Sequence, residues 1–446
     1  MRGPLSTCVV IVAASIAGPG CGNAAGQGRA GCTDEAGKPL PVAPASARID
    51  RYDPSFSTPL AITNPLNPIA QLDRVILLGS SDGARFRVET TLLPYTKRIR
   101  WNGRDIDALV SQYVAFADGR IQEVALDWYA QADDGSVWYL GEDVSNYEKG
   151  VIIDTEGTWL AGRDGPGAMI MGAAPQVGNV WRTENICGLV FEEVTVRSTG
   201  VTVPGPRGPV PGALIVEELH QDRTREDKIF APGYGEFSTG AGANLEAVAL
   251  AVPIDALGGA LPPELATLSA GADQVFDSAG AGKWSFASTA VGSLKAAWNT
   301  LKASAQPPMV AAQMDTAIAA MAAAVVAKQP GPARQRAIDV ARVTLDLRLR
   351  YEPRAAIDHG LLLLWVRQLL VDTEARDHDG ISGDIATLKW MRDRIVTDAE
   401  ALAGIDAALG AIRSAATSRD LPKATAARAD LEVLLQEAAR RLRPRP

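Results

Sequence analysis

Residues 124–143 read Val-Ala-Leu-Asp-Trp-Tyr-Ala-Gln-Ala-Asp-Asp-Gly-Ser-Val-Trp-Tyr-Leu-Gly-Glu-Asp. Val124, Leu126 and Trp128 alternate with small or polar neighbours, which is the period of a strand with one buried face. The run 137–140 is strand-prone as well. Between them, Asp133-Asp134-Gly135 supplies carboxylates for local backbone donors and a glycine that accepts positive φ. The stretch therefore predicts a β-hairpin.

The aromatic side chains of this hairpin have two interpretations. Trp128, Trp138 and Tyr139 carry a large apolar area, so we expect them first of all in the core. In the alternative, these three and Trp181 line a cleft for an apolar or sugar-like ligand. The direction in which the rings point separates the two.

The hairpin also carries a family resemblance. The segments 128–131 and 134–142 resemble the WYAQ-x-x-DG-x-VWY-x-GE motif of secreted bacterial proteins of unknown function. Segments 157–162, 175–182 and 231–235 resemble further steps of the same pattern. The resemblance spans residues 52–252 and implies an exported, β-rich domain. It implies no activity, because none is assigned to that family.

The length of the chain and the distribution of its charged residues limit the number of domains and the kinds of partner that we expect. A chain of 446 residues is expected to form two domains. Residues 1–283 hold 22 Lys and Arg against 34 Asp and Glu, whereas residues 284–446 hold 22 against 18. The acidic first part argues against nucleic acid as a partner.

The N-terminus indicates export. The apolar run from Cys8 to Gly18 has the length of a signal-peptide core and is too short to span a bilayer. Gly20 and Cys21 fit a bacterial lipobox, while Gly18 and Pro19 depart from it. We expect residues 1–21 to be a signal peptide and Cys21 to carry a lipid that anchors the protein to the membrane, at the cell envelope. Secretion without an anchor is the alternative.

Cysteine parity supports a second expectation. With Cys8 removed and Cys21 lipidated, Cys32 and Cys187 remain as a pair that an oxidising compartment permits to form a disulfide. The alternative is a free thiol at Cys32 and a small buried residue at Cys187.

Composition and periodicity predict an α+β, two-domain chain. Residues 22–71 are rich in Gly, Ala and Pro and read as a tether. Residues 72–252 show short strands with turns such as Asn102-Gly103, which predict an antiparallel β sandwich or half-barrel. Residues 253–283 read as a linker that contains one short helix. Residues 284–443 show helical periodicity and predict a bundle of four or five helices.

No set of catalytic or metal-binding residues is visible in the sequence. His359 and His378 lie about 28 Å apart along a helix, so they cannot share a metal, and no metal or cofactor is predicted. Segment 377–384 resembles a calcium loop only superficially and reads better as a polar turn between helices. The most direct interpretation is a non-enzymatic binding module for a protein or a small apolar ligand.

Two alternatives remain. In the first, the protein is a secreted hydrolase in which Glu142 and either Glu193 or Glu217 converge in a cleft. Adjacent carboxylates on a strand face opposite sides, which splits each neighbouring pair. In the second, the helical part works through a pocket lined by Trp365, Trp390 and His359.

Overall fold

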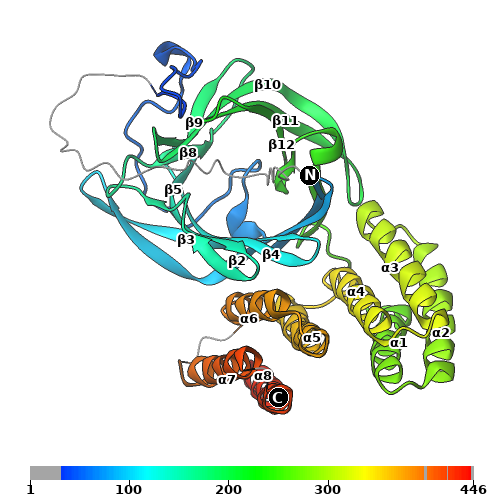
Figure 1. The fold of residues 1–446 in the computed structure, drawn as a ribbon. Coiled ribbons are helices and arrows are strands. Elements are labelled where there is room, and N and C mark those ends of the chain that lie inside the picture. Colours follow the sequence, from blue (N-terminus) through cyan, green and yellow to red (C-terminus); the bar gives the residue numbers. More distant parts are fainter. Residues whose placement is uncertain (1–31, 396–398, 419, 443–446) are drawn as a thin grey trace, which may run out of the picture. The chain divides into compact units, whose positions relative to one another are not determined.

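The computed structural model of the chain describes residues 32–395, 399–418 and 420–442 (Figure 1). The predicted signal peptide, its Cys21 and the start of the tether lie outside the described residues. The chain divides into a β unit, which holds residues up to 248 apart from two short segments, and a helical unit. The helical unit holds those segments, 120–122 and 147–152, together with residues from 249 onward. A large antiparallel sheet followed by helices agrees with the predicted α+β class.

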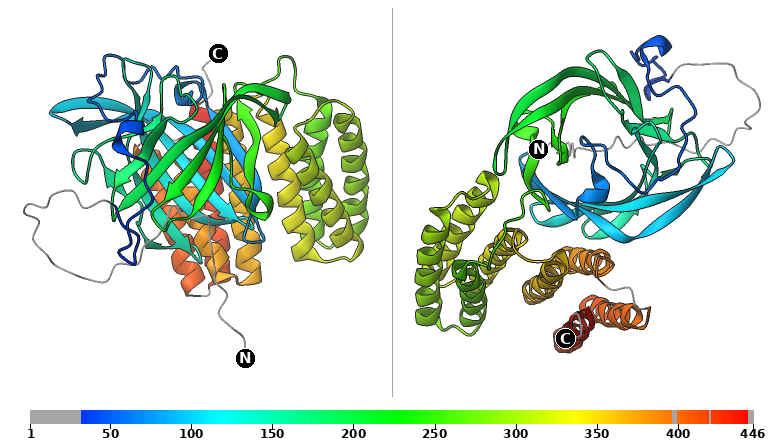
Figure 2. Two further views of the ribbon diagram at one scale, coloured as in Figure 1. Left: turned by 90° about the horizontal axis from the view of Figure 1, so that it is seen from above. Right: turned by 180° about the vertical axis from the view of Figure 1, so that it is seen from behind.

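One sheet of 14 strands makes up the β unit. Its strand order is β6-β5-β4-β3-β2-β1-β14-β13-β12-β11-β10-β9, with β7 and β8 both paired to β5 (Figures 1 and 2). The strands are β1 (Arg74–Ser81), β2 (Ala84–Trp101), β3 (Arg104–Ala117), β4 (Arg120–Gln131), β5 (Val137–Glu148), β6 (Val151–Asp154), β7 (Trp159–Leu160), β8 (Ala168–Met171), β9 (Val180–Ile186), β10 (Val190–Gly205), β11 (Gly208–His220), β12 (Arg225–Ala231), β13 (Gly235–Thr239) and β14 (Glu246–Val252).

The predicted hairpin is β4 and β5. Its register pairs Asp127 with Glu142 and Tyr129 with Tyr139, and the shift between these pairs marks a bulge. Gly141 lies in the bulge with φ +124°, and a Cβ there would meet the Trp159 carbonyl oxygen at 2.3 Å. Only glycine therefore fits. The predicted turn at Asn102-Gly103 has positive φ at both residues, as a two-residue hairpin turn requires.

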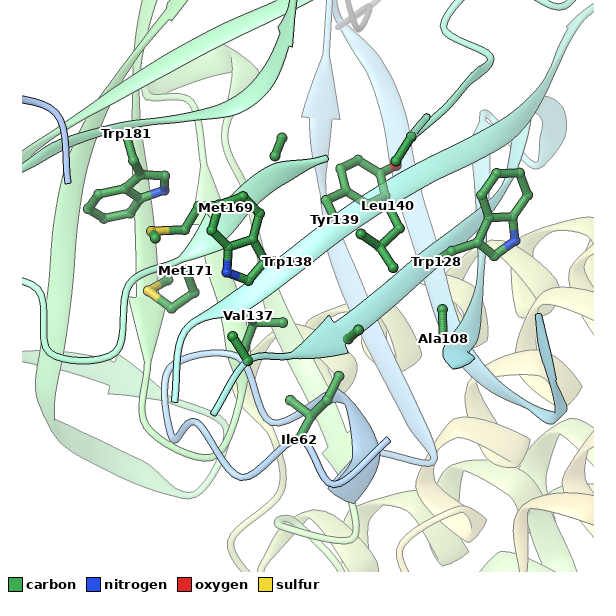
Figure 3. Packing of buried hydrophobic residues seen from close by; sticks show 14 of the residues in the cluster. Ile62, Ala108, Trp128, Val137, Trp138, Tyr139, Leu140, Met169, Met171 and Trp181 are labelled. Carbon is green, nitrogen blue, oxygen red and sulfur yellow. The ribbon is translucent and has the colours of Figure 1, made fainter. Parts of the chain in front are cut away.

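The aromatic residues of the hairpin belong to the core of the β unit. Trp128, Trp138 and Tyr139 are buried in one hydrophobic cluster with Trp181 (Figure 3). Trp159 belongs to the same cluster. Trp138 and Tyr139 also make aromatic contacts with their neighbours, and the Tyr139 ring stacks on Tyr129 at 4.8 Å between centroids. This is the packing that the core interpretation predicts.

The predicted tether is not a free linker over its described part. Ile62 is fully buried in the main cluster, and Ile49, Phe56 and Leu66 pack against it. The Gln131 side chain accepts hydrogen bonds from the backbone of Thr63 and Asn64. Apolar residues spaced between the prolines explain this docking, because they bury area that a solvated linker would leave exposed.

The start of the described chain is fixed by a disulfide. Cys32 and Cys187 are bonded, with 5.2 Å between their Cα atoms. Cys32 and Leu40 lie in a small cluster with Phe191 and Leu219, which come from β10 and β11. The first described residues thus pack on the side of these strands that carries Phe191 and Leu219.

The helical unit contains more helices than predicted. They are α1 (Pro263–Gly280), α2 (Trp284–Lys302), α3 (Pro308–Val326), α4 (Pro330–Arg348), α5 (Arg354–Ala375), α6 (His378–Arg392), α7 (Ala399–Thr417) and α8 (Leu421–Leu442). The linker prediction for 253–283 is wrong over α1, which packs on α2 and α4. Leu265, Leu268, Val275 and Phe276 form its buried face at helical spacing, whereas the Gly and Pro residues on both sides favour a linker. The predicted polar turn is the start of α6, where Asp377 accepts from the Gly380 N–H.

One helix in the described part of the chain, α3, is long and apolar enough to cross a membrane by length and composition. Its buried residues include Val310, Met314 and Met321, and it packs on α2 and α4. This burial is also what a core helix of the unit requires.

Replacing the fully buried Trp159 tests the core. We expect Trp159→Ala to lower the free energy of unfolding by about 3–5 kcal/mol, because it removes a large side chain from a close-packed cluster. Val177→Ala, at a side chain that is 64% exposed, is the control and should change it by less than about 0.5 kcal/mol. Urea unfolding of both variants measures the difference, and equal effects would contradict the packing.

Candidate cation site in the β unit

Four neighbouring strands bring ionisable side chains together on one face of the sheet. The β9–β10 register pairs Glu184 with Glu192, and the β10–β11 register pairs Glu192 with His220. Glu218 lies two residues before His220 and so faces the same side. Glu226 of β12 is paired with Glu218. Residues that are far apart in the sequence therefore share one patch.

Strand alternation separates each pair of adjacent carboxylates, as the sequence predicts. Glu192 and Glu218 join the patch, whereas their neighbours turn away from it. Glu193 accepts from the Ala43 N–H at 2.6 Å and from Arg182 at 3.0 Å. Glu217 pairs with surface arginines. The pairs expected for a hydrolase, Glu142 with Glu193 or Glu217, consequently do not face one patch.

His220 lies between two carboxylates. Its Nδ1 is 3.4 Å from Oε1 of Glu192, and its Nε2 is 3.3 Å from Oε1 of Glu226. Burial lowers the pKa of His220, but the hydrogen bonds to these two residues outweigh it and raise the pKa to about 10. Burial raises the pKa of Glu192, yet His220 and the charge of Lys228 bring it down to about 2. His220 is therefore an imidazolium in this arrangement.

Lys228 supplies the second buried cation. Its Nζ lies 2.7 Å from Oε2 of Glu218, which is only 1% exposed. Burial and the nearby Glu192 charge raise the pKa of Glu218 to about 7 despite this ion pair. Thr183 Oγ1 lies 3.1 Å from a Glu192 oxygen and 3.4 Å from a Glu218 oxygen, so it links the two carboxylates.

Further carboxyl groups from β4, β5 and β9 extend the patch. Glu142 and Glu184 interact with each other, and burial raises the pKa of both well above its usual range. Oε1 of Glu142 has no hydrogen-bond partner within the protein, and the residue is buried, with only 4% of its surface exposed. Asp127 accepts from the Tyr139 hydroxyl at 2.9 Å, and burial raises its pKa to about 7. We name the whole set the carboxylate array: Asp127, Glu142, Glu184, Glu192, Glu218 and Glu226, with His220 and Lys228.

Three members of the array are close enough to share a metal ion. One ligand atom from each of Glu192, Glu218 and His220 lies within 4.8 Å of the others, the one such group among the described residues. The sequence prediction of no metal-binding residues missed it. Glu218 and His220 form a Glu-x-His step on a strand, which places both on one face and was the available signal. Glu192 joins them only through strand pairing.

The predicted ligand-facing aromatics lie as follows. Trp128 carries the Lys97 Nζ 3.1 Å above its ring. The indole N–H groups of Trp138 and Trp181 donate to Ser136 Oγ and to the Ile170 carbonyl. Tyr139 reaches the array through its hydroxyl. The structure thus brings one of the four predicted aromatics to the acidic patch.

The helical unit contains a cavity of about 380 Å³. Trp390 lines it, with Tyr147 and the cationic side chains Lys389 and Arg413 nearby in its wall. Trp390 donates to the Tyr147 hydroxyl at 2.7 Å. Of the three residues predicted to line a pocket in this unit, Trp390 does so; Trp365 and His359 are not among the lining residues.

Searches with the chain against protein-family models, curated proteins and solved structures give no match.

The raised pKa values predict a particular pH dependence of stability. Burial and the neighbouring Glu236 and Glu226 raise the pKa of Glu246 to about 8. A carboxyl group whose pKa is raised in the folded state stabilises most below its unfolded pKa, and the contribution is lost as the pH rises through the folded pKa. We expect the melting temperature to fall between about pH 4.5 and pH 8 for this reason.

Circular dichroism melts across that range measure the effect. Glu246→Gln should flatten the slope, because it removes one of the titrating groups. Glu217→Gln is the matched control, since the pKa of Glu217 is lowered by Arg197 and Arg225 in spite of the opposing effect of burial. It should keep the slope of the original chain. A melting temperature that rises from pH 5 to pH 8 would contradict the assignment.

Proposed function

We propose that this chain is an exported, envelope-tethered binding protein whose β unit takes up a cationic ligand in the carboxylate array. One observation carries the proposal: the buried carboxyl groups of the array exceed its two cations, His220 and Lys228. Burying ionised carboxylates without partners is costly, so such a set holds protons or binds a cation. A positively charged ligand supplies the missing charge.

The array supports a cation better than it supports an apolar ligand. The aromatic side chains pack on one another, and the polar atoms of Trp138, Tyr139 and Trp181 are hydrogen-bonded within the protein. Oε1 of Glu142 has no hydrogen-bond partner, and this acceptor belongs to a buried carboxyl group that a cation would suit better than an apolar ligand. The hydrolase alternative has less support, because Glu193 and Glu217 are engaged by Arg182 and by surface arginines.

We infer that the sheet curls into a half-barrel around the array. Strand β8 pairs with β5 and lies beside β9, so it links the two ends of the strand order. A curled sheet would bring β5 near β9, which agrees with the interaction between Glu142 and Glu184. We also infer that the helices form a bundle of sequential neighbours, since each contacts the next along the chain from α1 to α8.

Export rests on different observations. The apolar run before Cys21 supports a signal peptide, and the resemblance of 52–252 to secreted proteins supports the same route. A disulfide such as that between Cys32 and Cys187 is typical of proteins in an oxidising compartment. Lipidation of Cys21 would hold the protein at the membrane.

Thermal unfolding in the presence of cations tests the proposal. We expect at least one of Ca²⁺, Zn²⁺ or spermidine to raise the melting temperature of the full chain at pH 7.5, relative to NaCl at equal ionic strength. Glu184→Gln should weaken that rise, since it removes an acidic member of the array, and Glu217→Gln should not. If none of these cations stabilises the chain, cation uptake is wrong.

Fractionation of cells tests the anchor. Cys21→Ser should move the protein from the membrane fraction to the soluble fraction, because the lipid attaches to this thiol. Cys8→Ser is the control and should stay at the membrane. Mass spectrometry of the mature N-terminus then identifies the lipid, and an unmodified Cys21 on membrane-bound protein would exclude the anchor.

A further inference from the structure

The metal-ligand group within the array permits a more specific conclusion than cation binding. Glu192 and His220 are paired across β10 and β11, and Glu218 faces the same side two residues away. Their ligand atoms all lie within 4.8 Å of one another. A tetrahedral zinc ion with bonds of about 2.0–2.2 Å holds its ligand atoms about 3.4 Å apart. Small side-chain rotations would bring these three atoms onto one ion.

The surroundings of His220 resemble those of a metal-binding histidine. Metal-bound histidines usually donate their second ring N–H to a carboxylate or carbonyl, which fixes the orientation of the ring. Here Nε2 lies 3.3 Å from a Glu226 oxygen, while Nδ1 faces Glu192. Thr183 holds the Glu192 and Glu218 carboxylates together. Each of the three ligands thus has a supporting partner.

The ammonium group of Lys228 supplies positive charge close to the carboxylates that would bind the metal ion. It is 2.7 Å from Glu218 and has Glu226 and Glu236 as further acidic neighbours. These neighbours give the ammonium group an alternative position when a metal binds Glu218. A second observation points to a ligand as well: Oε1 of the buried Glu142 lacks a partner, and Glu142 contacts Glu184 next to Glu192.

We propose that Glu192, Glu218 and His220 bind a divalent transition-metal ion of the zinc type. Binding releases the proton from the His220 nitrogen that becomes the ligand, so this proton and the ammonium group of Lys228 together supply the positive charge in the metal-free protein. This inference rests on the proposed cation uptake and narrows it. An imidazole with two carboxylates suits zinc and its neighbours in the first transition series, whereas Ca²⁺ and Mg²⁺ prefer oxygen ligands alone. Glu226 is a positioning residue in this site.

Titration of the chelator-stripped full chain tests the proposal. We expect one Zn²⁺ per chain by calorimetry and by elemental analysis after dialysis, and Co²⁺ should give visible absorption bands of a low-coordinate nitrogen and oxygen site. Glu218→Gln and His220→Asn should abolish stoichiometric binding. Glu226→Gln should weaken it by about 10–100-fold, as loss of a supporting carboxylate does.

Two further variants keep the result interpretable. Lys228→Met should bind Zn²⁺ more tightly, because it removes the internal competitor, and a merely destabilised protein would not show this gain. Glu217→Gln, the adjacent residue on the opposite face, should bind like the original chain. A chain that is stabilised by Ca²⁺ or spermidine but binds no Zn²⁺ or Co²⁺ would overturn the metal site and leave cation uptake standing. A chain that responds to no cation would overturn both.

Discussion

The cost of burying like charges on one sheet face is the constraint on which the rest of the β unit depends. Strand pairing fixes Glu184, Glu192 and Glu218 near one another, and Glu184 and Glu218 are buried. Each buried carboxyl group must therefore hold a proton or meet a cation. His220 and Lys228 supply only part of this charge, and burial together with the neighbouring carboxylates raises the pKa of Glu142 and of Glu184.

The alternation of side chains along β10 and β11 also explains why the opposite face of these strands carries ordinary ion pairs and apolar contacts. Glu193 and Glu217 are adjacent to array members but are directed toward arginines and backbone donors. Phe191 and Leu219, on that opposite face, are covered by Cys32 and Leu40. Strands β10 and β11 thus contribute buried, interacting ionisable groups to one side of the sheet and ordinary ion pairs and apolar contacts to the other. The amino-acid composition of these strands does not distinguish the two faces.

Local features of the fold could be predicted from the sequence, whereas long-range pairings could not. The hairpin at 124–143 and the turn at Asn102-Gly103 depend on neighbouring residues, so their chemistry is visible in the chain. The site depends on Glu192 meeting His220 across two strands, and nothing local records that register. The helix α1 has an apolar face at helical spacing, but Pro262-Pro263 before it and Gly280-Ala281-Gly282 at its end favour a linker instead. The packing of residues 49–70 on the β unit is not predicted, because their prolines favour an extended, irregular segment and not a packed one.

The disulfide and the array act on the same strands. Cys187 lies in the turn between β9 and β10, so Glu184 and Glu192 flank it on either side. The Gly188 N–H donates to Gln221, which in turn donates to the Thr33 carbonyl, so the end of β11 is fixed to the same segment. The N-terminal segment therefore clamps the strand ends that carry Glu184, Glu192 and His220. Such external support lowers the cost of holding repelling groups in a fixed geometry, which is what a preorganised binding site requires.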